Sequence, residues 1–304
     1  MSGQVKEQPV IEVEALSVEL SGRGVDHGIG LRNVSLQLKR GEVMVLAGEH
    51  GCGTSLLGSL ILGVAMPGTR VMSGSILFEG EEVIKARRSR KRQLRCEEIS
   101  FLPRNIEEQF NPNQTVRQCL RETGKLMGRN KPALPESEWS DLFYRVGIVE
   151  PERVLLRRIS ELSHLMIRKL GLMRTLLTQS KLLICDHALG SLDRVAAYQF
   201  VELLHQLGKE SEMAVLMMSG SLRSLERFAD RVAVFYEGGV LEAGTTSDII
   251  RAPEHLYTKE FLKCVPDLST YPEELPVISR EAIREAENSI HGREAADAAI
   301  QAAD

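Results

Sequence analysis

The chain has 304 residues, of which 43% are hydrophobic and 26% are charged, a composition typical of a globular protein with a sizeable core. Its formal net charge of −4 gives no reason to expect general binding to nucleic acid. The five cysteines are scattered and never spaced as C-x-x-C, which indicates reduced thiols rather than a disulfide framework or a zinc site.

The N-terminal part predicts strands that lead to a glycine-rich loop. Residues 11–20 and 33–39 alternate apolar and polar side chains, which is typical of half-buried strands. Residues 43–48, VMVLAG, form the continuous apolar run of a buried strand. Apolar residues then recur at helical spacing from Ser55 to Leu62. The order strand, loop, helix is the context that a phosphate-binding loop requires.

The loop matches the pattern G-x-x-x-x-G-K-[ST] except at its lysine. Gly48, Gly53 and Ser55 have the required spacing, and Thr54 stands at the lysine position. The glycines let backbone N–H groups turn inward around an anion, but a threonine cannot replace the point charge that reaches the terminal phosphates. The sequence therefore predicts a phosphate cradle without its cation, formed by Gly48, Gly51, Cys52, Gly53, Thr54, Ser55 and Leu56.

The later strands are predicted from short apolar runs bounded by turn residues. We expect an edge hairpin over 74–84 and a hairpin over 232–244 that turns at Gly238-Gly239. Single strands are expected at 97–105, 181–186 and 213–219.

The helical predictions concern four stretches. Residues 115–180 are mostly of helical pattern, with a Pro-rich break at 131–136 and an amphipathic helix over 137–148, and a further helix is expected over 193–207. The run 85–95 has seven basic residues in eleven and predicts a solvated loop or helix face, the alternative being contact with anionic lipid heads or an acidic partner. From Ser279 onward we expect one weak helix that ends after Gly292.

Strands alternating with helices, a phosphate loop and a later strand ending in Asp186 indicate an α/β nucleotide-binding fold. The order of motifs resembles the ATP-binding subunits of ABC transporters, and within them the oligopeptide, dipeptide and nickel importer group. The resemblance covers roughly residues 10–265, and FNPNQTV and APEHLYTKEFL are its most specific pieces for that group. The other motifs are RGEVMVLAGEHGCGTS, LPRNIEEQF, ISELSHLM, LLICDHALGSLD, MMSGSL and YEGGVLEAG.

The resemblance implies the architecture and the partners. It implies an ABC-type ATP-binding domain over 10–275, with a mixed-sheet core, antiparallel N-terminal strands and an α-helical subdomain at about 107–178. We expect residues 1–9 to be disordered and 276–304 to form a weakly helical or disordered tail. The family works as head-to-tail dimers on membrane permeases, which implies a homologous ATP-binding subunit as partner, a peripheral place on the cytoplasmic face of the membrane, and no nucleic acid. No apolar run approaches the ~18 residues of a membrane helix and no signal peptide is visible, which agrees with that expectation.

Positions that contact nucleotide in the family carry different residues here. The signature that closes over the partner's ATP reads LSHLM, of which Ser163 keeps its identity. The Mg²⁺-shell acid is kept as Asp186, and Ser55 would be the other Mg²⁺ ligand. The altered positions are Leu20 for the adenine-stacking aromatic, Arg104 for the glutamine, His187 for the catalytic glutamate and Gly220 for the switch histidine.

These departures predict weak binding of ATP with Mg²⁺ and no hydrolysis in this subunit's own site. His187 is either a base or a packed side chain. We expect a degenerate subunit of a peptide or nickel importer that works in a heterodimer with a competent ATPase. The alternatives are a pseudo-ATPase kept as a regulatory or scaffolding module, and a working ATPase that uses Arg104 or Arg174 in place of the lysine. Only Cys264 lies where the group often carries a cysteine-rich stretch, so no iron–sulfur cluster is expected.

Overall fold

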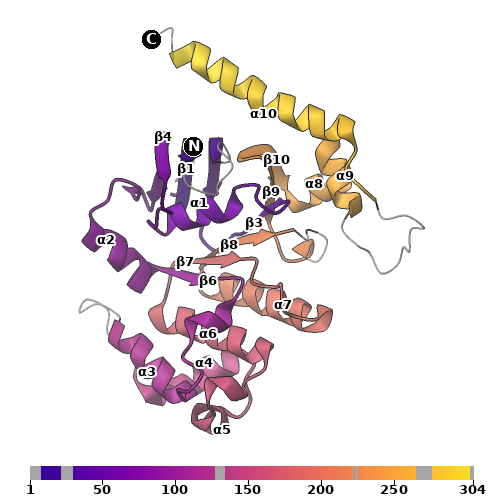
Figure 1. The fold of residues 1–304 in the computed structure, drawn as a ribbon. Coiled ribbons are helices and arrows are strands. Elements are labelled where there is room, and N and C mark those ends of the chain that lie inside the picture. Colours follow the sequence, from indigo (N-terminus) through magenta and orange to yellow (C-terminus); the bar gives the residue numbers. More distant parts are fainter. Residues whose placement is uncertain are drawn as a thin grey trace, which may run out of the picture. The chain divides into compact units, whose positions relative to one another are not determined.

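The computed structural model describes residues 8–21, 30–126, 134–220, 222, 225–264 and 276–301, and of these 291–301 by backbone only. The chain divides into two compact units, with residues 1–85 and 218–304 in unit 1 and residues 86–217 in unit 2 (Figure 1). Strand β8 (Ala214–Ser219) lies where the two units divide. The predicted disorder of 1–9 and the break at 131–136 fall mainly outside the described residues.

The N-terminal strands of unit 1 form an antiparallel sheet in the order β2-β1-β4-β5. Strand β1 (Ile11–Leu20) pairs with β2 (Leu31–Leu38) and with β4 (Thr69–Phe78), and β5 (Glu81–Glu82) is a two-residue edge. The predicted strand over 11–20 is confirmed. The hairpin predicted over 74–84 begins earlier, because β4 pairs along the whole of β1 and its first residue, Thr69, lies opposite Leu20.

The second set of strands in unit 1 has a parallel pair beside an antiparallel one. Strand β3 (Val43–Gly48) is parallel to β9 (Arg231–Tyr236), which is antiparallel to β10 (Gly239–Thr245). The β9–β10 turn is formed by Glu237 and Gly238, both with positive φ, so the predicted turn at Gly238-Gly239 is wrong by one residue. Gly239 instead pairs with Tyr236 as the first residue of β10, which is the register of a two-residue hairpin.

The starts of the first two helices of unit 1 follow from their local sequence. Helix α1 (Thr54–Ile61) follows the phosphate loop, and α8 (Thr246–Arg251) starts after Thr245, whose hydroxyl accepts a hydrogen bond from the Asp248 N–H. Helix α9 (Leu256–Cys264) precedes α10 (Arg280–Gln301). Helix α10 continues past Gly292, where we expected it to end, and it buries Ala282, Ala286 and Ile290.

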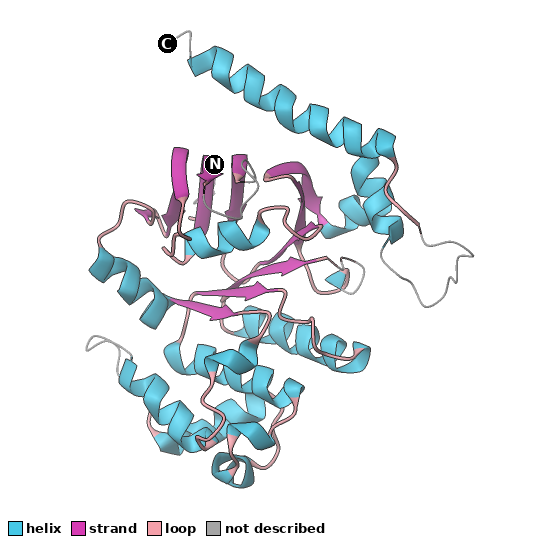
Figure 2. Ribbon diagram, viewed as in Figure 1, coloured by secondary structure: helices cyan, strands magenta, loops and turns pink. Residues whose placement is uncertain are grey.

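Unit 2 combines a parallel strand pair with the predicted helical region. Strand β6 (Ile99–Leu102) is parallel to β7 (Leu182–Asp186); β7 buries all but its last residue, and β6 buries Ile99 and Leu102. Figure 2 shows the helices of the region gathered together, and they are α3 (Val116–Leu126), α4 (Trp139–Arg145), α5 (Pro151–Leu156) and α6 (His164–Thr178). Helix α7 (Arg194–Glu210) follows β7, as predicted. The subdomain boundary at 107–178 stays a prediction.

From Arg88 onward the basic run forms helix, one of the two forms predicted for it. Helix α2 (Arg88–Gln93) passes into a π-helical turn, Leu94–Glu98, which ends at β6. Among the described residues, no helix combines the length and the apolar character that crossing a bilayer requires.

Candidate nucleotide site

The phosphate loop of unit 1 keeps the backbone shape of an anion cradle. It joins the end of β3 to the start of α1, and Gly51 and Gly53 take φ values of 88° and 100°. These values are favourable only for glycine. A Cβ added at Gly51 would meet nothing within 4 Å, so no atom crowds the loop at this glycine. The part of the prediction that rests on glycine spacing is therefore supported by the geometry.

The residue at the lysine position is buried and faces its own loop. Thr54 is 4% exposed, and its Oγ1 lies 3.7 Å from the Sγ of Cys52. Burial raises the pKa of the Cys52 thiol, so the pair presents a neutral hydroxyl and a neutral thiol. No charge replaces the lysine at this point of the loop.

The phosphate loop is held by Gly238, which belongs to the C-terminal part of unit 1. The N–H of Gly238 donates a hydrogen bond of 2.9 Å to the carbonyl of Cys52. A Cβ on Gly53 would lie 3.1 Å from Leu31 Cδ2 and 3.2 Å from Gly238 Cα, so Gly53 packs closely against the Leu31 side chain and the Gly238 backbone. The sequence did not identify Gly238 as a supporting residue, since its glycine pair indicated only a turn.

The other predicted site residues of unit 1 are Ser55, Leu56 and Gly220. Ser55 is half-buried in the first turn of α1, and Leu56 is buried beneath it. At the position of the switch histidine, a Cβ on Gly220 would lie 3.8 Å from the carbonyl oxygen of Gly48. The structure thus brings Gly220 to the end of β3, but with no side chain that could contact a phosphate.

In unit 2, the acidic strand end is followed by a tight turn. Asp186 is the last residue of β7, and His187 takes a positive φ of 48°. The carbonyl of His187 accepts a hydrogen bond of 3.1 Å from the Gly190 N–H. A Cβ on Gly190 would lie 3.7 Å from Arg104 Nε, so the structure brings the predicted Arg104 to this turn.

The signature segment begins α6 beside the start of α7. Ser163 is the N-cap of α6, and its Oγ accepts a hydrogen bond of 3.3 Å from the Met166 N–H. A cavity of about 440 Å³ adjoins it and is lined by both helix starts. Its lining residues are Ser163, His164, Leu165, Ser191, Leu192, Asp193, Val195, Ala196 and Gln199.

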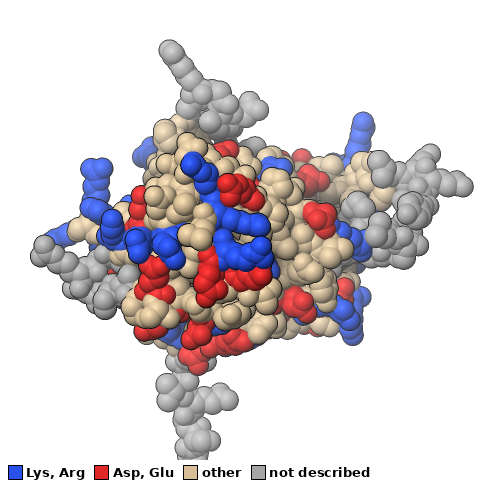
Figure 3. Space-filling view, turned by 90° about the horizontal axis from the view of Figure 1, so that it is seen from below, with Lys and Arg blue, Asp and Glu red and all other residues tan. Residues whose placement is uncertain are grey.

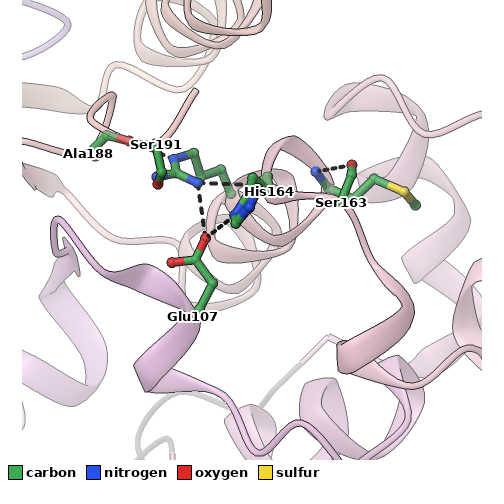
Figure 4. Close-up of polar contacts among 7 residues, drawn as sticks. Glu107, Ser163, His164, Ala188 and Ser191 are labelled. Atoms are coloured by element: carbon green, nitrogen blue, oxygen red, sulfur yellow. Dashed lines mark hydrogen bonds and ion pairs between the residues drawn. The ribbon is translucent and has the colours of Figure 1, made fainter. Parts of the chain in front are cut away.

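A fully buried arginine connects the signature helix to the turn after β7. The side chain of Arg168 is 0% exposed and makes four hydrogen bonds (Figure 4). Nε donates to the Ala188 carbonyl at 2.6 Å and Nη2 donates to Ser191 Oγ at 2.6 Å. Nη1 donates to the His164 carbonyl at 3.2 Å and to Glu107 Oε1 at 3.3 Å.

Glu107 is shared between Arg168 and the signature. Its Oε1 also lies 2.8 Å from Nδ1 of His164, whose side chain is 66% exposed. Partial burial by itself would raise the pKa of Glu107, but the His164 hydrogen bond and the Arg168 charge together hold it below its usual range. The sequence did not indicate Glu107 or Arg168, because no local pattern signals a contact between residues so far apart in the chain.

The comparisons agree with this geometry. A sequence model described as ABC transporter matches residues 31–190. The chain is 30% identical to the probable D,D-dipeptide transport ATP-binding protein DdpD of Escherichia coli, over 89% of this chain and 83% of that protein. It is 30% identical to the dipeptide transport ATP-binding protein DppD of Bacillus subtilis, over 82% of this chain and 74% of that protein.

One relative is much longer than the matched region. The chain is 31% identical to the peptidoglycan transport ATP-binding protein YejF of Agrobacterium fabrum, but the match covers 85% of this chain and 47% of that protein. The chain therefore spans about half the length of that relative.

Solved structures share the fold. The cbiO1 protein of Clostridium perfringens, part of the ABC transporter complex cbiONQ, has a TM-score of 0.68 at 24% identity, over 82% of this chain and 94% of that one. An ATP-binding cassette solved as a dimer in a post-hydrolysis state with ADP and Pi has a TM-score of 0.64 at 17% identity, over 78% of this chain and 98% of that one. At these identities the likeness concerns the fold alone, and it confirms the predicted α/β ABC architecture.

Proposed function

Because the chain belongs to the ABC transporter family, we propose that it is an ATP-binding subunit of a peptide-type transporter whose own nucleotide site has lost hydrolysis. It binds Mg-ATP weakly, pairs with a homologous and competent ATP-binding subunit, and acts on membrane permease subunits from the cytoplasmic face. The relatives named for dipeptide, D,D-dipeptide and peptidoglycan transport support the peptide class over nickel.

The observation that carries the proposal is the state of Thr54 in an otherwise intact loop. The loop keeps the left-handed glycines of a phosphate cradle, with open space beside Gly51. At the lysine position, however, a buried hydroxyl contacts Cys52 instead of reaching outward as a cation. A charge-assisted hydrogen bond is worth about 1.5–3 kcal/mol, so its loss weakens nucleotide binding by roughly tenfold to a hundredfold.

The remaining groups suit weak binding of Mg-ATP. Backbone N–H groups from Gly51 to Ser55 would hold the phosphates, and Ser55 and Asp186 are the candidate Mg²⁺ ligands. The bound metal would neutralise charge between the phosphates. The residues at the catalytic positions argue against hydrolysis, because Gly220 has no side chain and His187 stands in place of a carboxylate.

The signature segment supports a heterodimer. In a dimer of the family's kind, LSHLM would face the partner's nucleotide, and Leu165 and His164 stand where glycines allow close approach. Each nucleotide site of a homodimer would thus combine a phosphate loop without its lysine with an altered signature segment. A competent partner would supply a complete phosphate loop to one site, and the α6 N-terminus capped by Ser163 would still offer its dipole there.

The test measures nucleotide binding by thermal unfolding of the full chain against rising Mg-ATP and Mg-ADP, since a ligand of the native state raises the midpoint. We expect a small shift for the wild type and a dissociation constant about tenfold to a hundredfold lower for Thr54→Lys. Thr54→Val is the matched control, because it keeps the shape and adds no charge. We expect it to leave affinity unchanged.

Three outcomes would count against the proposal. Steady hydrolysis by the purified wild type would show that the site is complete and would favour an arginine in the role of the lysine. Equal affinity of the wild type and Thr54→Lys would remove Thr54 as the cause of weak binding. The absence of any shift at millimolar nucleotide in both proteins would favour a pseudo-ATPase that serves as an interaction module.

A further inference from the structure

Helix α2 and the turn that follows it carry a surface of one charge. From Arg87 to Arg95 the sequence is RRSRKRQLR, with six basic residues and no acidic one. None of the residues of α2 is buried. The side chains of Arg88, Arg92 and Arg95 are exposed. Arg88 and Arg92 are four residues apart and therefore lie on one face of α2, and Arg95 lies in the π-helical turn that follows. We call these three residues the α2 basic face.

The opposite side of the same segment fixes which way this face points. Leu94 is 2% exposed, and Arg90 is paired with Glu98 on the protein side of the helix. Arg90 and Leu94 are four residues apart and therefore lie above one another. Because Arg90 and Leu94 hold that side of the helix against the protein, the α2 basic face is directed to solvent.

Several other arginines of unit 2 are matched with a carboxylate. Figure 3 shows a face on which Lys and Arg side chains gather with Asp and Glu side chains around them. The ion pairs include Arg121 with Glu136 at 2.8 Å and Arg153 with Glu150 at 3.0 Å. Arg88 and Arg92 differ from these, because within the described residues neither contacts an acidic side chain.

The arrangement is unfavourable for the free protein. Like charges four residues apart on a helix repel one another, as Arg88 and Arg92 do. Arg88 also lies at the helix N-terminus, where the macrodipole disfavours a cation. An external polyanion would remove both penalties.

We propose that the α2 basic face binds the headgroups of anionic phospholipids at the surface of the membrane beside which a transporter subunit works. Guanidinium groups bind phosphate in bidentate fashion. Clusters of four to eight basic residues are typical of segments that contact anionic lipid, and the run from Arg87 to Arg95, to which the α2 basic face belongs, has six. A nucleic acid fits less well, because the run from Arg87 to Arg95 has no aromatic side chain for base stacking.

The experiment is cosedimentation of the full chain with vesicles. One set contains equal parts of phosphatidylglycerol and phosphatidylcholine, and the other contains phosphatidylcholine alone. We expect binding to the anionic vesicles only, and loss of that binding at high salt. Arg88→Gln combined with Arg92→Gln should weaken binding by about 30-fold, at about fivefold for each basic residue removed near an anionic surface.

The matched control is the double variant Arg121→Gln with Arg153→Gln. It removes the same charge from two side chains that are 60% and 75% exposed. We expect it to bind anionic vesicles within about twofold of the wild type, because its arginines are already paired. Circular dichroism would check that both variants fold.

Several results would overturn the proposal. These are equal binding to both kinds of vesicle, equal weakening by the two double variants, or no binding to anionic vesicles by the folded wild type. Arg88-dependent binding of single-stranded RNA without vesicle binding would assign the face to nucleic acid instead.

Discussion

The buried guanidinium of Arg168 gives the sharpest test of how unit 2 is held together. We consider Arg168→Met, which keeps most of the aliphatic volume and removes every donor. In the folded protein this leaves the Ala188 carbonyl, the His164 carbonyl and the Ser191 hydroxyl without their partner. Because methionine fills the space, the cost comes from polar groups rather than from a cavity.

The magnitude follows from the three neutral acceptors and the carboxylate. Each lost hydrogen bond to a neutral group costs about 1 kcal/mol, which gives about 3 kcal/mol for the three. Glu107 adds little, because its side chain is 32% exposed and it keeps His164 as a partner. For a chain of 304 residues a loss of about 3 kcal/mol lowers the thermal midpoint by about 5 °C.

The assay is urea and thermal unfolding followed by circular dichroism, with Arg174→Met as the control on the same helix. The guanidinium of Arg174 lies 5.2 Å from the centroid of the Phe110 ring, a contact worth about 0.5–1 kcal/mol. We expect Arg168→Met to lose about three to six times as much stability as the control, and Arg168→Lys to fall between them. Equal losses for Arg168→Met and Arg174→Met would refute the reasoning.

Three further predictions concern other contacts. Glu107→Gln should lower the free energy of unfolding near pH 7, because a carboxyl with a lowered pKa stabilises the fold only while it is ionised. The difference in stability between variant and wild type should therefore shrink as the pH falls below about 4.5, and urea midpoints across this range would measure it. Gly53→Ala should lower the free energy of unfolding by about 1–3 kcal/mol, since φ at this residue is 100° and the new methyl group would crowd Leu31. It should also abolish the shift of the thermal midpoint with Mg-ATP, and an unchanged shift would contradict this geometry. Ile290→Ala should cost about 2–4 kcal/mol and expose α10 to proteolysis, because the side chain is 4% exposed and packs on Gly239; an unaltered digestion pattern would contradict it.

The features that the sequence predicted well are local ones. The strand, loop and helix from Val43 to Ile61 depend on residues that are neighbours in the chain, and their apolar pattern and glycine spacing indicate the same structure. The same holds for β7 and α7, where Asp193 caps the helix by accepting hydrogen bonds from the N–H groups of Val195 and Ala196.

The features that it did not predict depend on distant residues or on a single backbone angle. Arg168 and Glu107 are 61 residues apart, and neither periodicity nor a motif indicates their contact. The β9–β10 turn was placed one residue late because Glu237, a residue with no special preference for positive φ, takes a φ of 41°. The sequence showed that Thr54 is not a lysine, but only the structure shows that its hydroxyl faces Cys52.

The support of the phosphate loop by Gly238 bears on the order in which the chain can fold during synthesis. Unit 2 is continuous in sequence, whereas unit 1 joins residues from both ends of the chain. Strand β3 lacks its parallel neighbour β9 until residue 236 has been made, and the Cys52 carbonyl lacks the Gly238 N–H until two residues later. We therefore expect unit 2 to fold while the chain is still being synthesised. The phosphate loop should reach its final conformation only after most of the chain has emerged from the ribosome.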